Sequence, residues 1–463
     1  MVSLSPIFIS GKAIDPLVEG GKGISVSNGI SAGAWAACGG AGTFSAVNAD
    51  YYDEKGNLVP IVYRERTRTL RHMELIRHAI RGGIAQARIA HEESRGRGRI
   101  HMNVLWEMGG VEQIIHGVLE KCHSLIHGIT CGAGMPYRLA QIAAQYKVFY
   151  LPIVSSARAF SALWRRAYSK YAEWMSAVVY EDPWKAGGHN GLSNQEDPLC
   201  PESPYERVRS LREKMRTFNL GHIPIIMAGG VWYLRDWAHW LNNPELGPIA
   251  FQFGTRPLLT QESPISNEWK KRLLTLSAGD VTLNTFSPTG FYSSAVRNSF
   301  LQELQERSER QVEYRMTPRD SFNTFILLSG NRGVYVTSSD AKKVTEWQSL
   351  GWTAPLKTPD QTVIFVTPEK MMEIRQDQIN CMGCLSACKF SNWKQPNASI
   401  AQKPDPRSFC IQKTLQNIAH NGSIEDNLLF AGHNAYLFKD DPFYANGFVP
   451  SVQQLLDRIR TGN

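Results

Sequence analysis

Short apolar runs alternate with segments of helical periodicity from residue 20 to about residue 260. This alternation is typical of strand–helix–strand units whose strands form a parallel sheet. Eight such runs occur, which is the number that closes a parallel barrel. The predicted strands are Gly20–Ser27, Gly39–Val47, Ile100–Trp106, Leu125–Cys131, Val148–Ser155, Ser176–Glu181, Ile223–Ala228 and Ile249–Gly254.

The segments between these runs carry apolar residues three or four positions apart, as on one face of a helix. Examples are Leu70, Met73, Ile76 and Ile80, and later Val208, Leu211 and Met215. We expect them to form the outer helices of an α/β protein, a TIM (β/α)8 barrel.

The pattern changes near residue 310. Residues 310–410 contain three short strand patterns, a probable helix near Ser339–Leu350 and a group of cysteines; the strands are Thr324–Leu328, Gly333–Thr337 and Thr362–Val366. We therefore predict a barrel over residues 1–309, a small inserted α/β lobe with a metal-binding loop over 310–410, and a C-terminal segment over 411–463 that returns to the barrel. That last segment ends in a helix with Val452, Leu455, Leu456 and Ile459 on one face.

Glycine-rich tails follow several predicted strands. Ala228-Gly229-Gly230 follows the seventh, and Gly254-Thr255-Arg256 follows the eighth. Glycine lets backbone amides approach a phosphate closely, and the loops after strands 7 and 8 are where this barrel commonly binds one. Together the two tails predict a phosphate site, although Gly-Gly pairs are also common in ordinary turns.

His189 lies in the sequence Ala186-Gly-Gly-His-Asn-Gly191, directly after the sixth predicted strand. The active site of such a barrel is built at this end of the strands, and an ordinary histidine pKa near 6.5 suits proton transfer near neutrality. We interpret His189 as a catalytic acid or base; a histidine that only bonds the backbone is the alternative.

The chain is basic, with a net charge of +8 among 463 residues and a pI near 9.0. Ten arginines lie between Arg64 and Arg99, in a helical segment and a Gly-Arg loop. The simplest interpretation is a solvated helix face; docking of an anionic substrate or of RNA is the alternative. The N-terminus lacks the order of a signal peptide and no long apolar run occurs, so we expect a cytoplasmic protein without a membrane partner.

Three of the eight cysteines, Cys381, Cys384 and Cys388, follow the spacing C-x2-C-x3-C. So dense a cluster indicates metal binding and not disulfides. Thiolates this close can share a [4Fe–4S] cluster, for which Cys410 is the nearest fourth ligand. A structural zinc site is the main alternative, and unligated thiols are a third.

The chain resembles the nitronate monooxygenase (2-nitropropane dioxygenase) family, whose relatives include flavin-dependent enoyl reductases. The matching segments are GGKGISVSNGISAGAWAACGGAGTFS, the strand around Asn103, GAGMP, PIVSS, AGGHNG, IPIIMAGG, FQFGTR, SPTGFYSSAVRN and LLFAGHNAYLF. The resemblance implies FMN, with His189 as the catalytic acid or base. It implies that the cofactor is contacted by Gly21, Lys22, Gly23, Asn103, Gly187, Gly188, Ala228, Gly229, Gly230, Gly254 and Thr255.

Lys22 departs from this family, which often has methionine in the first glycine loop. We expect Lys22 to hold an anion or to alter the flavin potential, and this departure puts ordinary nitronate oxidation in doubt. The cysteine spacing is similar to the cluster loop of 2,4-dienoyl-CoA reductase and trimethylamine dehydrogenase, which are also FMN barrels, although their fourth cysteine follows sooner than Cys410 does here.

A flavin gathers two electrons and an iron–sulfur centre carries one, so the pair suits a reductase fed by a one-electron donor. We therefore predict a reductase of an activated double bond, acting on a small-molecule substrate for which an anion is one candidate. No second Gly-x-Gly-x-x-Gly unit follows a strand, which favours an external donor such as a ferredoxin or an NAD(P)H-dependent reductase. The alternatives are a nitronate monooxygenase, a flavin-dependent RNA-modifying enzyme and a degenerate barrel without catalysis.

Overall fold

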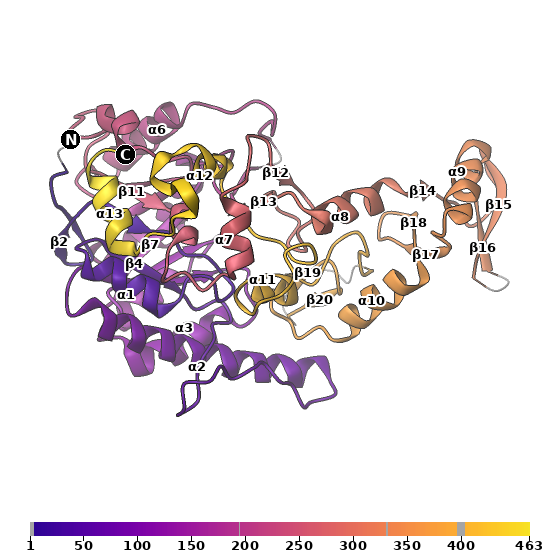
Figure 1. Ribbon diagram of the computed structural model, residues 1–463, viewed down its shortest axis with the longest axis horizontal. Coiled ribbons are helices and arrows are strands. Elements are labelled where there is room, and N and C mark those ends of the chain that lie inside the picture. The colour runs from indigo at the N-terminus through magenta and orange to yellow at the C-terminus, as the bar shows by residue number, and fades with distance from the viewer. Residues whose placement is uncertain (1–3, 194, 330–331, 396–402) are drawn as a thin grey trace.

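The computed structural model describes residues 4–193, 195–329, 332–395 and 403–463. A barrel, an arm that extends from the barrel's open end, and a C-terminal segment that lies back on the barrel are visible in Figure 1. No helix among the described residues combines the length and the apolar character needed to cross a bilayer.

Eight parallel strands close the barrel in the order β10-β11-β3-β4-β5-β6-β7-β8, which confirms the predicted TIM barrel. The strands are β3 (Leu17–Glu19), β4 (Ala41–Ser45), β5 (Arg99–Leu105), β6 (Gly128–Gly132), β7 (Phe149–Val154), β8 (Val178–Glu181), β10 (Ile225–Ala228) and β11 (Ile249–Phe253). The last seven overlap the predicted runs.

The prediction of a strand at Gly20–Ser27 is wrong. The first barrel strand is the three-residue β3 just before it, and residues 20–27 form a loop. The loop turns back on itself, because the Ser27 amide donates to the Lys22 carbonyl at 2.9 Å and Ser25 has φ +60°. Its alternating residues resemble a strand, but the glycines before them allow the chain to turn across the end of the barrel.

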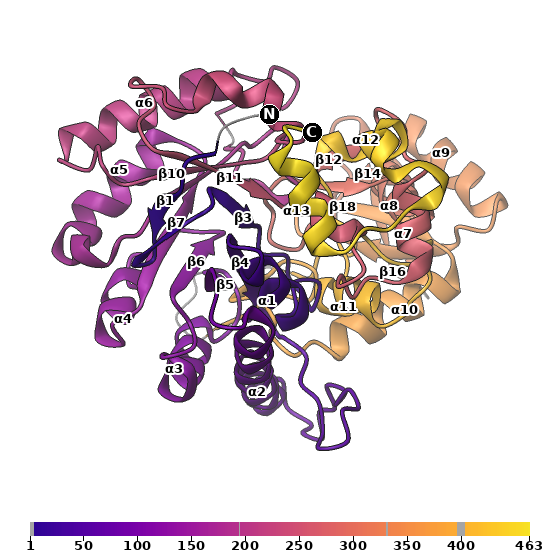
Figure 2. The same ribbon diagram turned by 60° about the vertical axis from the view of Figure 1, so that its left-hand side comes forward.

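Helices on the outside of the barrel alternate with its strands, as Figure 2 shows. They are α1 (Gly29–Ala37), α2 (Arg68–Ser94), α3 (Val111–Cys122), α4 (Leu139–Gln145), α5 (Ala157–Arg166) and α6 (Pro204–Thr217), with the short 3-10 helices η1 (Tyr168–Trp174), η2 (Leu234–Trp240) and η3 (Arg256–Leu259). Helix α6 buries the predicted face of Val208, Leu211 and Met215.

The predicted buried face of α2 is only partly right. Ile76 is buried, but Leu70 and Met73 are 46% and 47% exposed. The reason is that α2 begins beside the arm, where Arg68 contacts residues 378 and 391, and reaches the barrel wall only further along.

The arm contains a three-stranded sheet, β14-β18-β17, and a hairpin, β15-β16. Its small core includes Val334, Val336, Val344, Val363 and Phe365. The elements are α8 (Ser299–Glu309), β14 (Gln311–Glu313), β15 (Phe322–Ser329), β16 (Arg332–Thr337), α9 (Ser338–Ser349), β17 (Ala354–Lys357), β18 (Thr362–Val366) and α10 (Pro368–Ile379). The three predicted strands and the predicted helix of this region are present.

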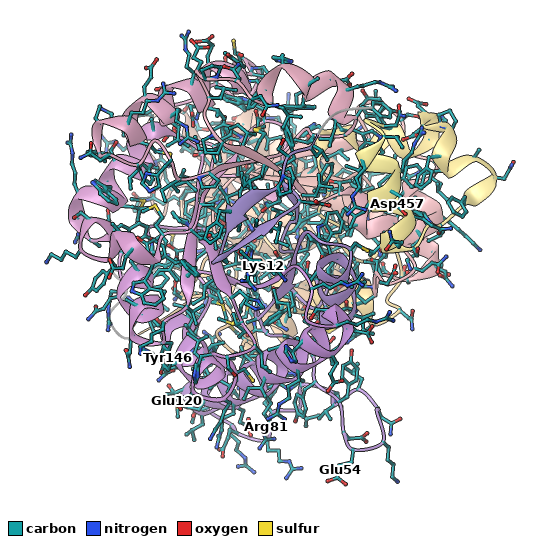
Figure 3. All side chains as sticks on the ribbon, turned by 90° about the vertical axis from the view of Figure 1, so that its left-hand side faces the viewer. Lys12, Glu54, Arg81, Glu120, Tyr146 and Asp457 are labelled. Atoms are coloured by element: carbon teal, nitrogen blue, oxygen red, sulfur yellow. The ribbon has the colours of Figure 1, made fainter. Side chains whose placement is uncertain are left out.

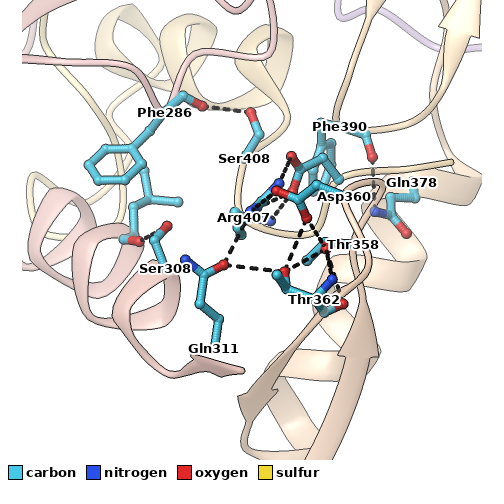
Figure 4. Close-up of polar contacts among 12 residues, drawn as sticks. Phe286, Ser308, Gln311, Thr358, Asp360, Thr362, Gln378, Phe390, Arg407 and Ser408 are labelled. Atoms are coloured by element: carbon cyan, nitrogen blue, oxygen red, sulfur yellow. Dashed lines mark hydrogen bonds and ion pairs between the residues drawn. The ribbon is translucent and has the colours of Figure 1, made fainter. Parts of the chain in front are cut away.

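Arg407 ties the arm to the segment that returns from it (Figure 4). Its guanidinium pairs with Asp360 and Asp405, each at 2.8 Å, and donates to Gln311 Oε1 at 3.1 Å. Ser408, the next residue, donates to the Phe286 carbonyl at 2.6 Å. The chain therefore re-enters the barrel region at a fixed point.

The remaining elements pack on the barrel, some of them at its open end. A small antiparallel sheet of order β12-β13-β9 lies there, and helix α13 packs against α1 with Val452, Leu455, Leu456 and Ile459 fully buried, as predicted. The elements are β9 (Gly188–His189), α7 (Asn267–Leu273), β12 (Val281–Asn284), β13 (Ser293–Val296), β19 (Ala387–Cys388), β20 (Trp393–Lys394), α11 (Ile411–Ala419), η4 (His433–Tyr436), α12 (Leu437–Asp440), η5 (Pro442–Gly447) and α13 (Val452–Arg460); a hairpin, β1 (Ile7–Ile9) and β2 (Lys12–Ile14), precedes the first barrel strand.

Candidate functional site

A large cavity opens at the carboxyl ends of the barrel strands, with about 1670 Å³ of space between atoms including its mouth. Every residue predicted to contact the cofactor or to act as acid or base lines it. These residues are Gly21, Lys22, Gly23, Asn103, Gly187, Gly188, His189, Ala228, Gly229, Gly230, Gly254 and Thr255. The structure thus brings together twelve residues that the sequence spreads over more than 230 positions.

Two neighbouring loops form a cradle of backbone amides in this cavity. Ala228 lies beside Gln252 in the β10–β11 pairing, so the loops after these strands are adjacent. Gly229 and Gly230 have φ of +91° and +81°. In the described part of the chain, none of the amides of Gly229, Gly230, Gly254 and Thr255 donates to a protein acceptor. Such unpaired donors, on glycines that let an anion come close, suit a phosphate group.

Arg256, the last residue of the second loop, has a different role. Its guanidinium is 1% exposed, donates to the Trp232 carbonyl at 2.9 Å and lies 3.9 Å from a carboxylate oxygen of Asp441. Thr255 Oγ1 accepts from the Gly432 amide at 2.9 Å. Both contacts hold the C-terminal segment over the cradle, so residues from the end of the chain help to form the site.

The first glycine loop lies against Asn103. A Cβ on Gly21 would stand 2.3 Å from Asn103 Cβ and Cγ, so only glycine fits there. Lys22 lines the cavity, but its ammonium donates to Glu19 Oε1 at 3.1 Å and to the Gly20 carbonyl at 2.8 Å. Glu19 is fully buried and also accepts from Ser31 at 2.7 Å. The Lys22 charge is therefore balanced inside the protein.

His189 is held at one ring nitrogen. Its Nε2 lies 2.6 Å from Ser287 Oγ, and Ser287 Oγ lies 2.9 Å from Thr289 Oγ1. The ring packs edge-on against Phe430, with 5.4 Å between ring centroids. Burial lowers the pKa of His189 to about 4, well below the ordinary value expected from the sequence. The imidazole is therefore neutral at pH 7 and can donate from one nitrogen while it accepts at the other.

Glu181 is a titratable group that the sequence did not single out. It ends β8, lines the cavity, and has its pKa raised to about 8 by burial and by the neighbouring charge of Asp182. Its carboxyl group is therefore protonated at pH 7 and can donate a hydrogen bond or a proton. Asp182 itself accepts from the amides of Trp184 and Lys185, both at 2.9 Å, and so shapes the turn that leads to His189.

The four predicted metal ligands gather beside the cavity. Cys381 and Cys384 lie in the loop after α10, Cys388 ends strand β19, and Cys410 precedes α11. Burial and the charges of the other three thiols raise the pKa of Cys384, and burial raises that of Cys410 to about 12. Cys384 also lines the cavity wall.

Hydrogen-bond donors face these sulfur atoms. Ser391 Oγ donates to Cys381 Sγ at 2.9 Å. The backbone amides of Gln412, Ser391 and Lys413 lower the pKa of Cys384, Cys388 and Cys410 respectively, against the stronger effect of burial. Within the described residues, no group of three or more histidine, cysteine or acidic side chains is arranged to hold a metal ion.

The cysteine loop is docked on the barrel by its backbone. The Gly109 amide donates to the Cys384 carbonyl at 3.0 Å, and the Ser386 amide donates to the Glu107 carbonyl at 2.7 Å. On the other side, Arg68 and Arg71 at the start of α2 donate to carbonyls of Gln378 and Ile379, at 2.7 and 3.0 Å. Two of the ten clustered arginines thus hold the loop in place.

Comparison with known proteins supports a flavin-binding barrel. The sequence profile described as nitronate monooxygenase matches residues 115–442. FabK from Thermotoga maritima superposes with a TM-score of 0.53 at 15% identity, over 96% of this chain and 92% of that one. The enoyl reductase domain of MlnA, from the macrolactin biosynthesis cluster of Bacillus amyloliquefaciens, gives a TM-score of 0.54 at 11% identity, over 96% and 93%. No curated protein sequence matches significantly.

Proposed function

Because the chain belongs to the nitronate monooxygenase family and is a flavin-dependent oxidoreductase, we propose that it is an FMN- and iron–sulfur-dependent reductase of an activated double bond. The observation that carries this proposal is the position of Cys384. It lies near the three other predicted ligand thiols, of which Cys381 and Cys388 are buried, and it also lines the cavity that contains His189. A flavin that only reacts with oxygen needs no such group beside it.

The cavity fits FMN. The phosphate would be held by the free amides of Gly229, Gly230, Gly254 and Thr255. Because Gly21 has no side chain and packs directly on Asn103, the first glycine loop would leave room for the flavin ring. When bound, FMN supplies hydride transfer. The protein contributes the binding energy, the orientation of the ring and the groups that handle protons.

The residue type and spacing of the four cysteines support an iron–sulfur cluster, although their side chains do not surround a metal position among the described residues. Cys381 and Cys388 are buried, and Cys384 and Cys410 are half-buried. Backbone amides face three of the four sulfur atoms, and hydrogen bonds to sulfur are one of the means by which proteins set cluster potentials. When bound, the cluster supplies one-electron transfer. The same four cysteines could instead hold a structural zinc ion, so metal content decides between the two.

Two neighbouring groups handle protons in this proposal. His189 is neutral, and its Nε2 is hydrogen-bonded to Ser287, so its other nitrogen is available to the substrate. Glu181 keeps its proton at pH 7 and can support the developing negative charge of a substrate carbonyl. Ser287 fixes the ring, which makes it a positioning residue for His189.

The substrate in this proposal is a small molecule, and electrons arrive from an external ferredoxin or NAD(P)H-dependent reductase. Because Glu19 balances Lys22, a substrate anion finds no free positive charge at Lys22. Nitronate oxidation is the second candidate, favoured by the family match itself. The two candidates differ in whether the cysteines are needed for turnover.

Anaerobic purification and reduction test the proposal. We expect iron, acid-labile sulfide and FMN in the protein, and we expect dithionite or reduced ferredoxin to bleach both chromophores. Cys384→Ser should lose the cluster and the reduction of FMN by ferredoxin, whereas Cys200→Ser, at an exposed thiol, should keep both. Zinc without iron or sulfide would refute the cluster. If NADPH reduced the FMN of Cys384→Ser as fast as that of the wild type, and the variant consumed oxygen rapidly with a nitronate as substrate, the monooxygenase would be favoured.

A further inference from the structure

Residues 64–99 concentrate arginines that form no ion pair with an acidic side chain of the described residues. At least sixteen lysines and arginines elsewhere form ion pairs within 4.0 Å. None of the ten between Arg64 and Arg99 pairs with an aspartate or glutamate of the described residues. This stretch holds ten arginines against four glutamates, so it carries a charge of +6 out of the total of +8.

Three of these arginines form a stripe on the outer face of α2. Arg77, Arg81 and Arg88 are exposed and lie at positions i, i+4 and i+11, which at 100° per residue keeps them within about 40° of one another. Arg95 and Arg97, also exposed, follow in the loop after the helix. Figure 3 shows Arg81 at the outer edge of the molecule.

The opposite face of α2 is committed to the barrel. It buries Leu75, Ile76, Ala79, Ala87 and Ala90. The large apolar side chains that α2 leaves exposed are Leu70 and Met73, both at its start. A basic amphipathic helix that binds a membrane needs instead a continuous apolar face along its length. The stripe is left to bind a partner through charge.

We infer that this stripe binds the phosphate backbone of a nucleic-acid duplex. From Arg77 to Arg88 the helix rises about 16 Å, too far for one small anion to bridge. A duplex carries about one charge per 1.7 Å of its axis and so presents about ten phosphates over that length. The helix has no Phe, Tyr or Trp from Arg68 to Ser94, so it offers no platform for stacking unpaired bases, and a duplex suits it better than a single strand.

The inference goes beyond the proposed oxidoreductase activity and is independent of it. The stripe lies on the barrel's side and none of its residues lines the cavity. At its other end, however, α2 holds the cysteine loop through Arg68 and Arg71. A nucleic acid bound along α2 would thus lie against an element that positions the cysteine loop.

The test compares salt dependence in the flavin-loaded protein. An RNA hairpin duplex and a DNA duplex of the same sequence, each fluorescently labelled, are titrated between about 50 and 200 mM salt. We expect Arg77→Gln/Arg81→Gln/Arg88→Gln to lower the slope of log affinity against log salt by about 2 to 3, and to weaken binding by about 10- to 100-fold. The RNA and DNA arms tell which duplex is preferred.

A matched variant controls for net charge. Arg158, Arg165 and Arg166 are exposed on α5, so their triple replacement by glutamine removes the same charge from another barrel helix. It should leave the salt slope within about one unit of wild type. Equal losses in both variants, or binding to vesicles rich in phosphatidylserine but to neither duplex, would overturn the inference. Flavin content and melting temperature, unchanged in both variants, show that the fold is intact.

Discussion

Replacing Gly229 by alanine tests the amide cradle most sharply. Gly229 has φ +91°, a conformation that costs an L-residue about 1–2 kcal/mol. Its new Cβ would lie 3.0 Å from the Ala186 amide nitrogen and 3.1 Å from Asp182 Cβ, so the loop must shift by a few tenths of an ångström. The shift moves the amides of Gly229 and Gly230 away from a bound phosphate.

The expected loss follows from these contacts. A hydrogen bond to a charged group contributes about 1.5–3 kcal/mol, so losing one of them weakens FMN binding by about 10- to 150-fold. Gly279→Ala provides the control, because Gly279 has nearly the same φ, +92°, but nothing within 4 Å of its Cβ, and it lies outside the cavity. Both variants should lose similar unfolding free energy from strain.

Titration of apoprotein with FMN, followed by flavin fluorescence, gives the affinities, and chemical unfolding gives the stabilities. We expect an affinity loss in Gly229→Ala alone. If Gly229→Ala bound FMN as tightly as wild type, or if Gly279→Ala lost affinity to the same extent, the assignment of the phosphate to this cradle would be wrong.

Three further variants test the groups that handle protons. His189→Ala should keep FMN and lose about 100-fold or more in turnover, measured on the reductase substrate, and unchanged turnover would make His189 structural. Ser287→Ala should keep FMN and change the pH profile of kcat, with Ser287→Thr restoring it; a profile identical to wild type would show that Ser287 does not position the ring. The pKa of Glu181 is about 8 in the folded protein and 4.5 in the unfolded chain. The folded protein therefore holds the proton more tightly, which stabilises it fully below pH 4.5, and this stabilisation is lost as the pH rises through 8. Glu181→Gln should therefore flatten the fall in unfolding free energy between about pH 4.5 and 8, by up to about 1.4 kcal/mol per pH unit, and equal curves for both proteins would refute the raised pKa.

The sequence was sufficient to predict the barrel and twelve of the residues that line its cavity. Glycine-rich tails after apolar runs mark the carboxyl ends of parallel strands, and in a closed barrel those ends meet. The first strand was missed because β3 has only three residues, whereas the Gly20–Ser27 loop after it has the alternation of a strand. Periodicity in α2 likewise could not show that Leu70 and Met73 lie beyond the barrel wall.

The properties that depend on burial could not be predicted. The low pKa of His189 and the high pKa of Glu181 both arise mainly from desolvation by segments far away in the chain. Ser287, which fixes His189, lies 98 positions further along. The contact of Gly432 with Thr255, 177 positions apart, is equally invisible without the fold.

The central claim is that the glycine loops after β10 and β11 hold FMN beside His189 and a redox-active group of cysteines. The visible spectrum of the protein purified without oxygen, together with its flavin, iron and sulfide content, tests it most directly. We predict bound FMN in about one copy per chain, with overlapping iron–sulfur absorption that dithionite bleaches. A colourless protein that neither contains FMN nor binds it when added would contradict the account.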